Sequence, residues 1–130
     1  MEPDDALRVW IVEDEPAAAA VASELCQNVG AKATIFLSPV PFLSALRSDD
    51  PPSAVVLDWR LEHELSAALF LATRHRFPTM PIVYWTGSGL DLLPDMVRAD
   101  QRTRVVDKAA GAVAFEAALG WAVGAGPTAG

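Results

Sequence analysis

Three features that define large classes of protein are scarce in this sequence: cysteine, positive charge and long apolar runs. A single cysteine, Cys26, excludes an internal disulfide and any zinc site built from clustered cysteines. The net charge of -7, from 17 acidic and 10 basic residues, argues against a nucleic-acid-binding surface, which needs a basic face. No apolar run approaches about 20 residues, so no membrane span is predicted. The acidic start, residues 1–5, is unlike a signal peptide, and a cytoplasmic location is expected.

Lysine and histidine are scarce as well. Eight of the ten basic residues are arginines, so only Lys32 and Lys108 are lysines, and a lysine at a strand end is informative. The two histidines, His63 and His75, are expected at the surface rather than in a metal site. Cys26 falls between apolar helix positions and is expected to be packed in the core.

What the sequence does contain is a regular alternation of strand-like and helix-like segments, repeated five times. The expected strands are residues 7–12, 33–36, 54–58, 81–85 and 104–107. The expected helices are residues 16–29, 39–47, 61–77, a short one from about 94, and 112–123. This alternation predicts an α/β fold of (βα)5 type, with a parallel five-stranded sheet covered by helices on both faces. Residues 1–123 are expected to form one domain, followed by a flexible tail over 124–130.

Local signals make three specific predictions about the helices. In the first helix, Val21, Leu25 and Val29 recur at helical spacing and predict one apolar face. Ser38 is expected to cap the second helix. A proline inside a helix costs about 3 kcal/mol, so the fourth helix is expected to start near Pro94 and to be short.

Chemically active side chains stand where four of the five strands end. A short apolar run leads directly into Asp58, as expected for a strand that is buried on both faces. The first strand leads into Glu13 and Asp14, the fourth into Thr86 and the fifth into Lys108. Because the carboxyl ends of parallel strands meet at one edge of a sheet, these side chains are expected to gather there.

This set of groups suits a hard cation and a phosphoryl group. Mg²⁺, or Mn²⁺ in its place, prefers oxygen ligands and is usually held by one or two carboxylates. Clustered carboxylates repel one another without a cation, and a lysine can bind a phosphoryl oxygen as a point charge. A carboxylate such as Asp58 can itself act as a nucleophile and carry a covalent phosphoryl group.

In this order, the five residues resemble the receiver domain of bacterial two-component response regulators. The spacings also fit, with 44 residues from Asp14 to Asp58, 28 more to Thr86 and 22 more to Lys108. The resemblance covers essentially the whole chain. It implies a flavodoxin-like fold with strand order 2-1-3-4-5. It further implies phosphoryl transfer from a histidine kinase or a histidine phosphotransfer protein, and a downstream protein target whose binding then changes.

The resemblance also implies a role for each residue. Asp58 would be the phosphoacceptor. Asp14 would bind Mg²⁺ directly and Glu13 through water, with the backbone carbonyl of Arg60 as a further ligand. Thr86 would supply the switch hydroxyl, and Lys108 would be the cation that contacts the phosphoryl group.

Two positions depart from the family pattern. Where the family often has an aromatic switch residue, three positions before the lysine, this chain has Val105. Where the family usually has a proline in a cis bond after the lysine, it has Ala109. A cis bond without proline costs about 2.5–4 kcal/mol, so the Lys108–Ala109 loop is expected to be trans and to have its own shape. Neither change removes a phosphorylation residue, but both make the usual route of the signal doubtful.

Two other functions fit parts of the pattern. A phosphatase of the haloacid dehalogenase type also uses a strand-end aspartate and Mg²⁺, but it needs a second aspartate where this chain has Arg60. A receiver-like binding module that is not phosphorylated is the other alternative. Neither direct nucleic-acid binding nor membrane binding is expected.

The last expected helix is unusually apolar. Its large residues spread over more than one face, and Glu116 is its only charged residue. A helix that is apolar on most sides should be covered, so it is predicted to pack against a partner, with a second copy of the chain as the candidate. The alternative is a small alanine-rich helix that tolerates modest exposure.

Overall fold

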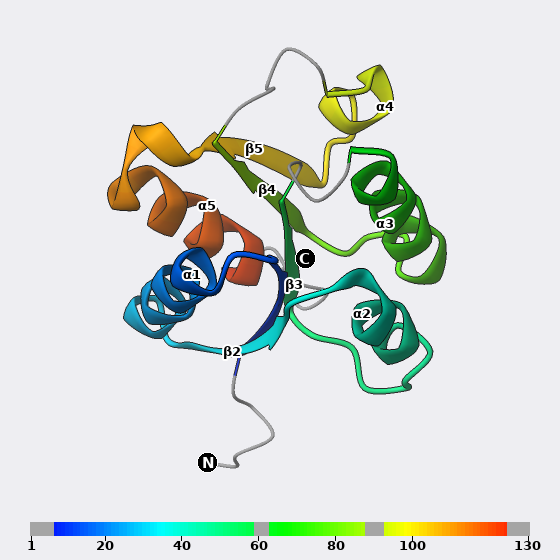
Figure 1. Cartoon of the computed structure of the whole chain (residues 1–130), viewed down its shortest axis with the longest axis horizontal. Helices are drawn as coiled ribbons and strands as arrows, with labels where there is room; N and C mark the ends of the chain where they lie inside the picture. Colours follow the sequence, from blue (N-terminus) through cyan, green and yellow to red (C-terminus); the bar gives the residue numbers. More distant parts are fainter. Residues whose placement is uncertain (1–6, 59–62, 88–92, 125–130) are drawn as a thin grey trace.

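The computed structural model describes residues 7–58, 63–87 and 93–124. Five parallel strands form one sheet in the order β2-β1-β3-β4-β5 (Figure 1). The strands are β1 (Leu7–Val12), β2 (Ala31–Phe36), β3 (Ala54–Leu57), β4 (Ile82–Thr86) and β5 (Thr103–Asp107). The helices are α1 (Pro16–Asn28), α2 (Pro39–Ala45), α3 (His63–Arg76), α4 (Asp95–Arg98) and α5 (Ala112–Gly124). The predicted flavodoxin-like α/β fold and its strand order are confirmed.

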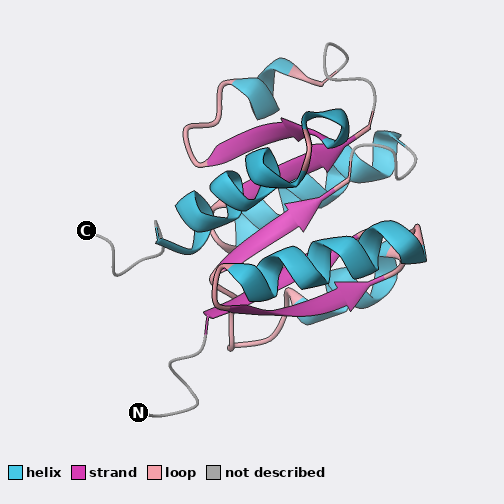
Figure 2. Cartoon of the chain, turned by 90° about the vertical axis from the view of Figure 1, so that its left-hand side faces the viewer, coloured by secondary structure: helices cyan, strands magenta, loops and turns pink. Residues whose placement is uncertain are grey.

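The sheet separates two layers of helices. Helices α1 and α5 cover one face, and α2, α3 and α4 cover the other (Figure 1). The strand arrows run the same way across the sheet (Figure 2), as the parallel registers require. Strands β3 and β4 are buried along their whole length because both edges and both faces are covered. The apolar run before Asp58 therefore has the burial that its composition predicted.

The first helix shares only part of its buried face with the predicted one. Leu25 is buried and Val29 packs half-buried against the core, as predicted, but Val21 is 47% exposed, so the prediction was wrong for Val21. The buried residues are Leu25 and three small ones: Ala19, Ala22 and Cys26. Small side chains let the helix approach the sheet closely, and this packing outweighs the apolar spacing at Val21.

Cys26 lies fully buried in this layer, which confirms that it is packed. Burial raises the pKa of its thiol to about 11, so the thiol stays protonated and unreactive at neutral pH. His75 is exposed, as predicted, and the side chain of His63 lies outside the described residues.

The helix ends follow the sequence signals with one exception. Pro94 is the N-cap of α4, and the helix spans only Asp95–Arg98, as predicted. Ser38 occupies the N-cap position of α2, but its side chain makes no capping hydrogen bond there, so this part of the prediction was wrong. Strand β2 begins at Ala31, two residues earlier than predicted, because pairing with β1 extends back to Leu7.

Arg74, on the last turn of α3, ties that helix to the start of β5. Its guanidinium binds the Asp100 carboxylate at 2.6 Å and 3.2 Å and donates to three backbone carbonyls of the loop before β4, those of Phe77, Pro78 and Met80. Asp100 also accepts a 2.6 Å hydrogen bond from the Thr103 hydroxyl. This network lies at the edge where β4 and β5 begin, opposite the carboxyl edge.

Helix α5 is partly covered. Phe115 and Leu119 are fully buried against the sheet, while Val113 is 79% exposed. Trp121 and Val123 are half-buried. Within the described ranges, no helix is both long enough and apolar enough to cross a membrane.

Candidate functional site

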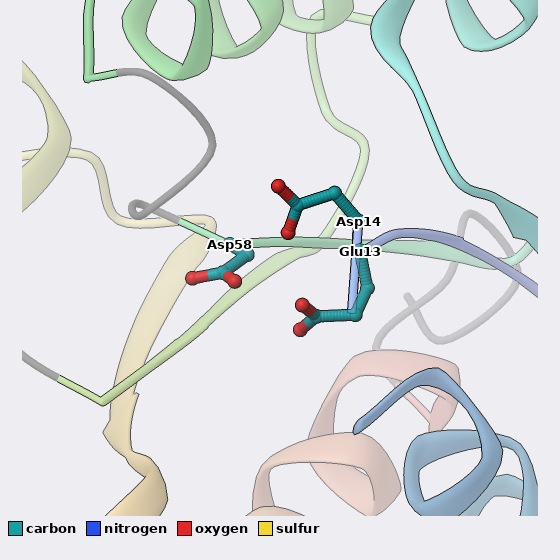
Figure 3. A group of neighbouring side chains, drawn as sticks. All are labelled: Glu13, Asp14 and Asp58. Atoms are coloured by element: carbon teal, nitrogen blue, oxygen red, sulfur yellow. The ribbon is translucent and has the colours of Figure 1, made fainter. Parts of the chain in front are cut away.

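The carboxyl edge of the sheet brings together three acidic side chains from two strands. Glu13 and Asp14 follow β1, and Asp58 follows β3, its immediate neighbour in the sheet. Figure 3 shows the three carboxylates facing a common space, and one carboxylate oxygen from each lies within 4.8 Å of the others. Glu13 and Asp58 are almost fully buried, and Asp14 is exposed. The gathering expected from the parallel topology is therefore present.

Lys108 supplies the positive charge of this cluster. Its ammonium donates to Glu13 Oε1 at 2.9 Å and to Asp58 Oδ2 at 3.4 Å, across 95 and 50 residues of sequence. The Lys108 side chain is 22% exposed, so these are ion pairs in a partly dry setting, where they are stronger than at an open surface. One ammonium thus pairs with two buried carboxylates, and the exposed carboxylate of Asp14 lies close to those two.

Burial and neighbouring charges both act on the carboxyl group of Glu13. Burial of the carboxyl raises its pKa above the ordinary value, and the nearby charge of Asp58 adds to the rise. The hydrogen bond from Lys108 acts in the opposite direction without cancelling it. Glu13 Oε2 also accepts from the Glu15 backbone N–H at 3.2 Å. Independently of this shift, three carboxylates share one ammonium in the cluster, and a bound cation would relieve the repulsion between them.

The cluster lines an open pocket of about 360 Å³ formed by Glu13, Asp14, Glu15, Asp58 and Lys108. The acidic donors are all carboxylate oxygens, which fits Mg²⁺ or Mn²⁺ and does not fit metals that prefer nitrogen or sulfur. Glu15 was missed as a lining residue, although the acidic run 13–15 was visible in the sequence. Its position before Pro16 suggested only the start of a helix.

Two further predicted site residues have different outcomes. Thr86 is the last residue of β4 and is fully buried at the same edge, between β3 and β5 in the strand order. Arg60, predicted to offer a backbone carbonyl, lies outside the described residues.

The two atypical positions have clear structural settings. Val105 is 37% exposed on β5, in register with Tyr84. The Lys108–Ala109 peptide bond is trans, as expected without proline. The turn after the lysine is a short 3₁₀ segment in which Asp107 Oδ1 accepts from the Ala109 backbone N–H at 2.8 Å. Gly111 ends this segment with φ 94°, a conformation that favours glycine. An aspartate cap and a glycine therefore shape the loop.

Comparisons with solved structures identify the fold. No protein-family model matches the sequence, and no curated protein matches it significantly. Solved structures do match. A response regulator receiver protein from Sinorhizobium medicae WSM419 superposes with a TM-score of 0.80 at 19% identity, covering 93% of this chain and 97% of that one.

Two further structures agree. A response regulator receiver domain (CheY-like) from Methylobacillus flagellatus has a TM-score of 0.73 at 25% identity, covering 90% of this chain and 98% of that one. The N-terminal domain of a response regulator/sensory box/GGDEF 3-domain protein from Carboxydothermus hydrogenoformans has a TM-score of 0.76 at 19% identity, covering 89% and 93%. The protein therefore has the fold of response regulator receiver domains.

Proposed function

We propose that the protein is a receiver domain that accepts a phosphoryl group on Asp58 in a Mg²⁺-dependent reaction. The observation that carries the proposal is the single ammonium of Lys108, 2.9 Å and 3.4 Å from the carboxylates of Glu13 and Asp58, at the border of the acidic pocket. A balanced structural ion pair has no need of a third carboxylate beside it, whereas a metal and phosphoryl site does.

The reaction follows from the positions of these groups. A carboxylate oxygen of Asp58 attacks the phosphorus of the donor, the bond from phosphorus to the donor's leaving group breaks, and an acyl phosphate forms on Asp58. Lys108 is within reach of Asp58, so its ammonium can pair with a phosphoryl oxygen. A bound Mg²⁺ supplies charge neutralisation of the transferring oxygens. Asp14 and Asp58 would hold it, with Glu13 and the Arg60 carbonyl assisting.

The partners proposed are those of a two-component pathway: a histidine kinase or a histidine phosphotransfer protein as donor, and a downstream protein as target, in the cytoplasm. The structural relative from Carboxydothermus hydrogenoformans is one domain of a three-domain response regulator, which supports a role in signalling. Thr86 is proposed as the hydroxyl that responds to the new phosphoryl group. Self-association through α5 is proposed from its exposed Val113.

The test is chemical labelling with a small acyl phosphate and Mg²⁺, followed by intact mass measurement. The protein should gain one phosphoryl group that hydroxylamine removes. Asp58→Asn should prevent labelling, and Asp49→Asn, at a fully exposed aspartate, should not. Undiminished labelling of Asp58→Asn would overturn the proposal. Sustained turnover of a generic phosphate ester would instead indicate the phosphatase alternative.

A further inference from the structure

Strand β4 carries two neighbouring aromatic residues that point to opposite faces of the sheet. Tyr84 belongs to the layer of α2, α3 and α4, and Trp85 to the layer of α1 and α5. The Tyr84 hydroxyl donates to the backbone carbonyl of Ser66 in α3 at 3.1 Å, in a fully buried position. This hydrogen bond holds the Tyr84 side chain in place. Tyr84 is in register with Val105 on the neighbouring strand, so a fixed aromatic side chain lies beside the position where the family often has its aromatic switch residue.

Trp85 is in contact with both the acidic site and α5. The Lys108 ammonium lies 4.8 Å from the centroid of the Trp85 ring, within the range of a cation–π interaction, for which tryptophan is the strongest partner. On α5, the Phe115 ring stacks on Trp85 with centroids 4.4 Å apart and an interplanar angle of 21°. Trp85 is 7% exposed and Phe115 fully buried, so this contact is part of the core.

Among the residues that the structure describes, Lys108 contacts the carboxylates of Glu13 and Asp58 and the indole of Trp85. The Trp85 ring restricts the position of the Lys108 ammonium. An ammonium that moved away from the ring would lose the cation–π attraction, which is stronger in a partly dry site. The lysine is also only four residues before the start of α5. Lys108 is thus connected to this helix both along the chain and through the stacked rings.

We propose that Trp85 is a positioning residue for Lys108, and that its stack on Phe115 links the charge state of the acidic site to α5. The link to phosphorylation rests on the proposed function. A phosphoryl group on Asp58 adds negative charge beside Lys108 and draws the ammonium toward it. The ammonium then shifts relative to the indole ring, and the Trp85–Phe115 pair repacks with α5. In this chain the Trp85–Phe115 pair would replace the aromatic switch residue, because position 105 is a valine.

Fluorine NMR of the full chain labelled with 5-fluorotryptophan tests this inference, because each of the four tryptophans reports on a different place. Trp59 follows Asp58 in the sequence and reports on binding at the site. Trp85 reports on the proposed link. Trp121, on α5 beneath the Arg104 guanidinium, reports on the helix. Trp10, buried against Phe36 and Phe42 on the other face, is the matched control. Single Trp→Phe variants assign the resonances.

The first arm needs no ligand. Lys108→Met should shift the Trp85 resonance and leave that of Trp10 in place, whereas Lys108→Arg, which keeps a cation, should shift Trp85 less. An unmoved Trp85 resonance in Lys108→Met overturns the inference, whatever the chemistry at Asp58 proves to be.

The second arm adds Mg²⁺ and beryllofluoride, a mimic of a phosphoryl group. The Trp59 and Trp121 resonances should both shift in the unmodified chain. In Trp85→Leu the Trp121 shift should be lost while the Trp59 shift remains, and Trp85→Phe, which keeps an aromatic ring, should restore it. A Trp121 shift that persists in Trp85→Leu overturns the link to α5. Silence of Trp59 in the unmodified chain counts against the proposed function instead, and the first arm then decides on Trp85.

Discussion

Two partly buried networks join a cation to carboxylates in this molecule, one at each edge of the sheet. At the edge where β4 and β5 begin, Arg74 meets one carboxylate, Asp100, and three backbone carbonyls use its remaining donors. At the carboxyl edge, Lys108 meets two carboxylates, and Asp14 brings a third to within 4.8 Å of them. The first network is balanced in charge, and the second is not.

The two networks have opposite effects on their carboxyl groups. Burial of Asp100 acts to raise its pKa, but the hydrogen bonds from Thr103, Arg74 and Arg102 outweigh it, and the pKa is lowered. At Glu13 burial prevails and the pKa is raised. Surplus like charge beside a pocket is unfavourable for folding and is typical of sites that bind or react. The comparison therefore separates a network that is balanced in charge from one that is not, and the proposed function rests on the second.

The largest expected effect concerns the reaction. Lys108→Met should lower the rate of acyl-phosphate labelling about 100-fold, because a charge that stabilises the transferring oxygens is removed. Arg74→Met removes the cation of the other network and should leave the rate of the folded protein within a few-fold of the unmodified chain. Time courses of intact mass measure both rates. Equal losses in the two variants would abolish the distinction between the networks.

The second expected effect is on stability. Arg74→Met should lower the free energy of unfolding by about 2–3 kcal/mol, because the partly buried Asp100 carboxylate loses its cation and three backbone carbonyls lose their donor. Arg76→Met, at a more exposed arginine two residues along the same helix, should cost less. Urea unfolding at neutral pH measures both. A cost for Arg74→Met no larger than that for Arg76→Met would show that its network adds little.

The third effect is metal-dependent. Mg²⁺ at about 10 times its dissociation constant should raise the free energy of unfolding by about 1.4 kcal/mol through mass action. Asp14→Ala should abolish this gain. Asp100→Ala should keep it, although the variant starts from a lower stability. Thermal unfolding with Mg²⁺ or with a chelator measures the difference. A gain that survives in Asp14→Ala would place the metal elsewhere.

The smallest effect is on pH dependence, without metal. The raised pKa of Glu13 means that its carboxyl stabilises the fold most below its ordinary value of 4.5, and that this stability is lost as pH rises through the folded-state value. Asp100 is the reverse, since its contribution is present above its ordinary value of 3.8 and is lost as pH falls below it.

Two neutral variants separate these contributions. Relative to the unmodified chain, Glu13→Gln should gain stability as pH rises above about 4.5, because it lacks the group that becomes unfavourable. Asp100→Asn should be less stable at neutral pH and should approach the unmodified chain under acid conditions. Denaturant unfolding across the acid range measures both differences. The same pH trend in the two variants would contradict the assigned shifts.

Much of the fold and of the site could be predicted from local sequence. The composition of each segment marked the five strands, and the topology of parallel strands then placed Glu13, Asp14, Asp58 and Lys108 at one edge. The helix face of α1 could not be predicted in this way, because small residues at Ala19 and Ala22 gain burial only when the sheet is beside them. The Arg74 network was missed because its partners come from separate loops.

The sequence by itself determined the order of the elements and the identity of the acidic and basic groups, because periodicity and residue type are local properties. Only the tertiary structure decided which groups share a proton donor and which rings meet. The Lys108 ammonium joins residues 95 and 50 positions away, and Trp85 stacks on Phe115 from another element. Such contacts depend on how the helix layers pack on the sheet, and the spacing of residues along the chain does not specify them.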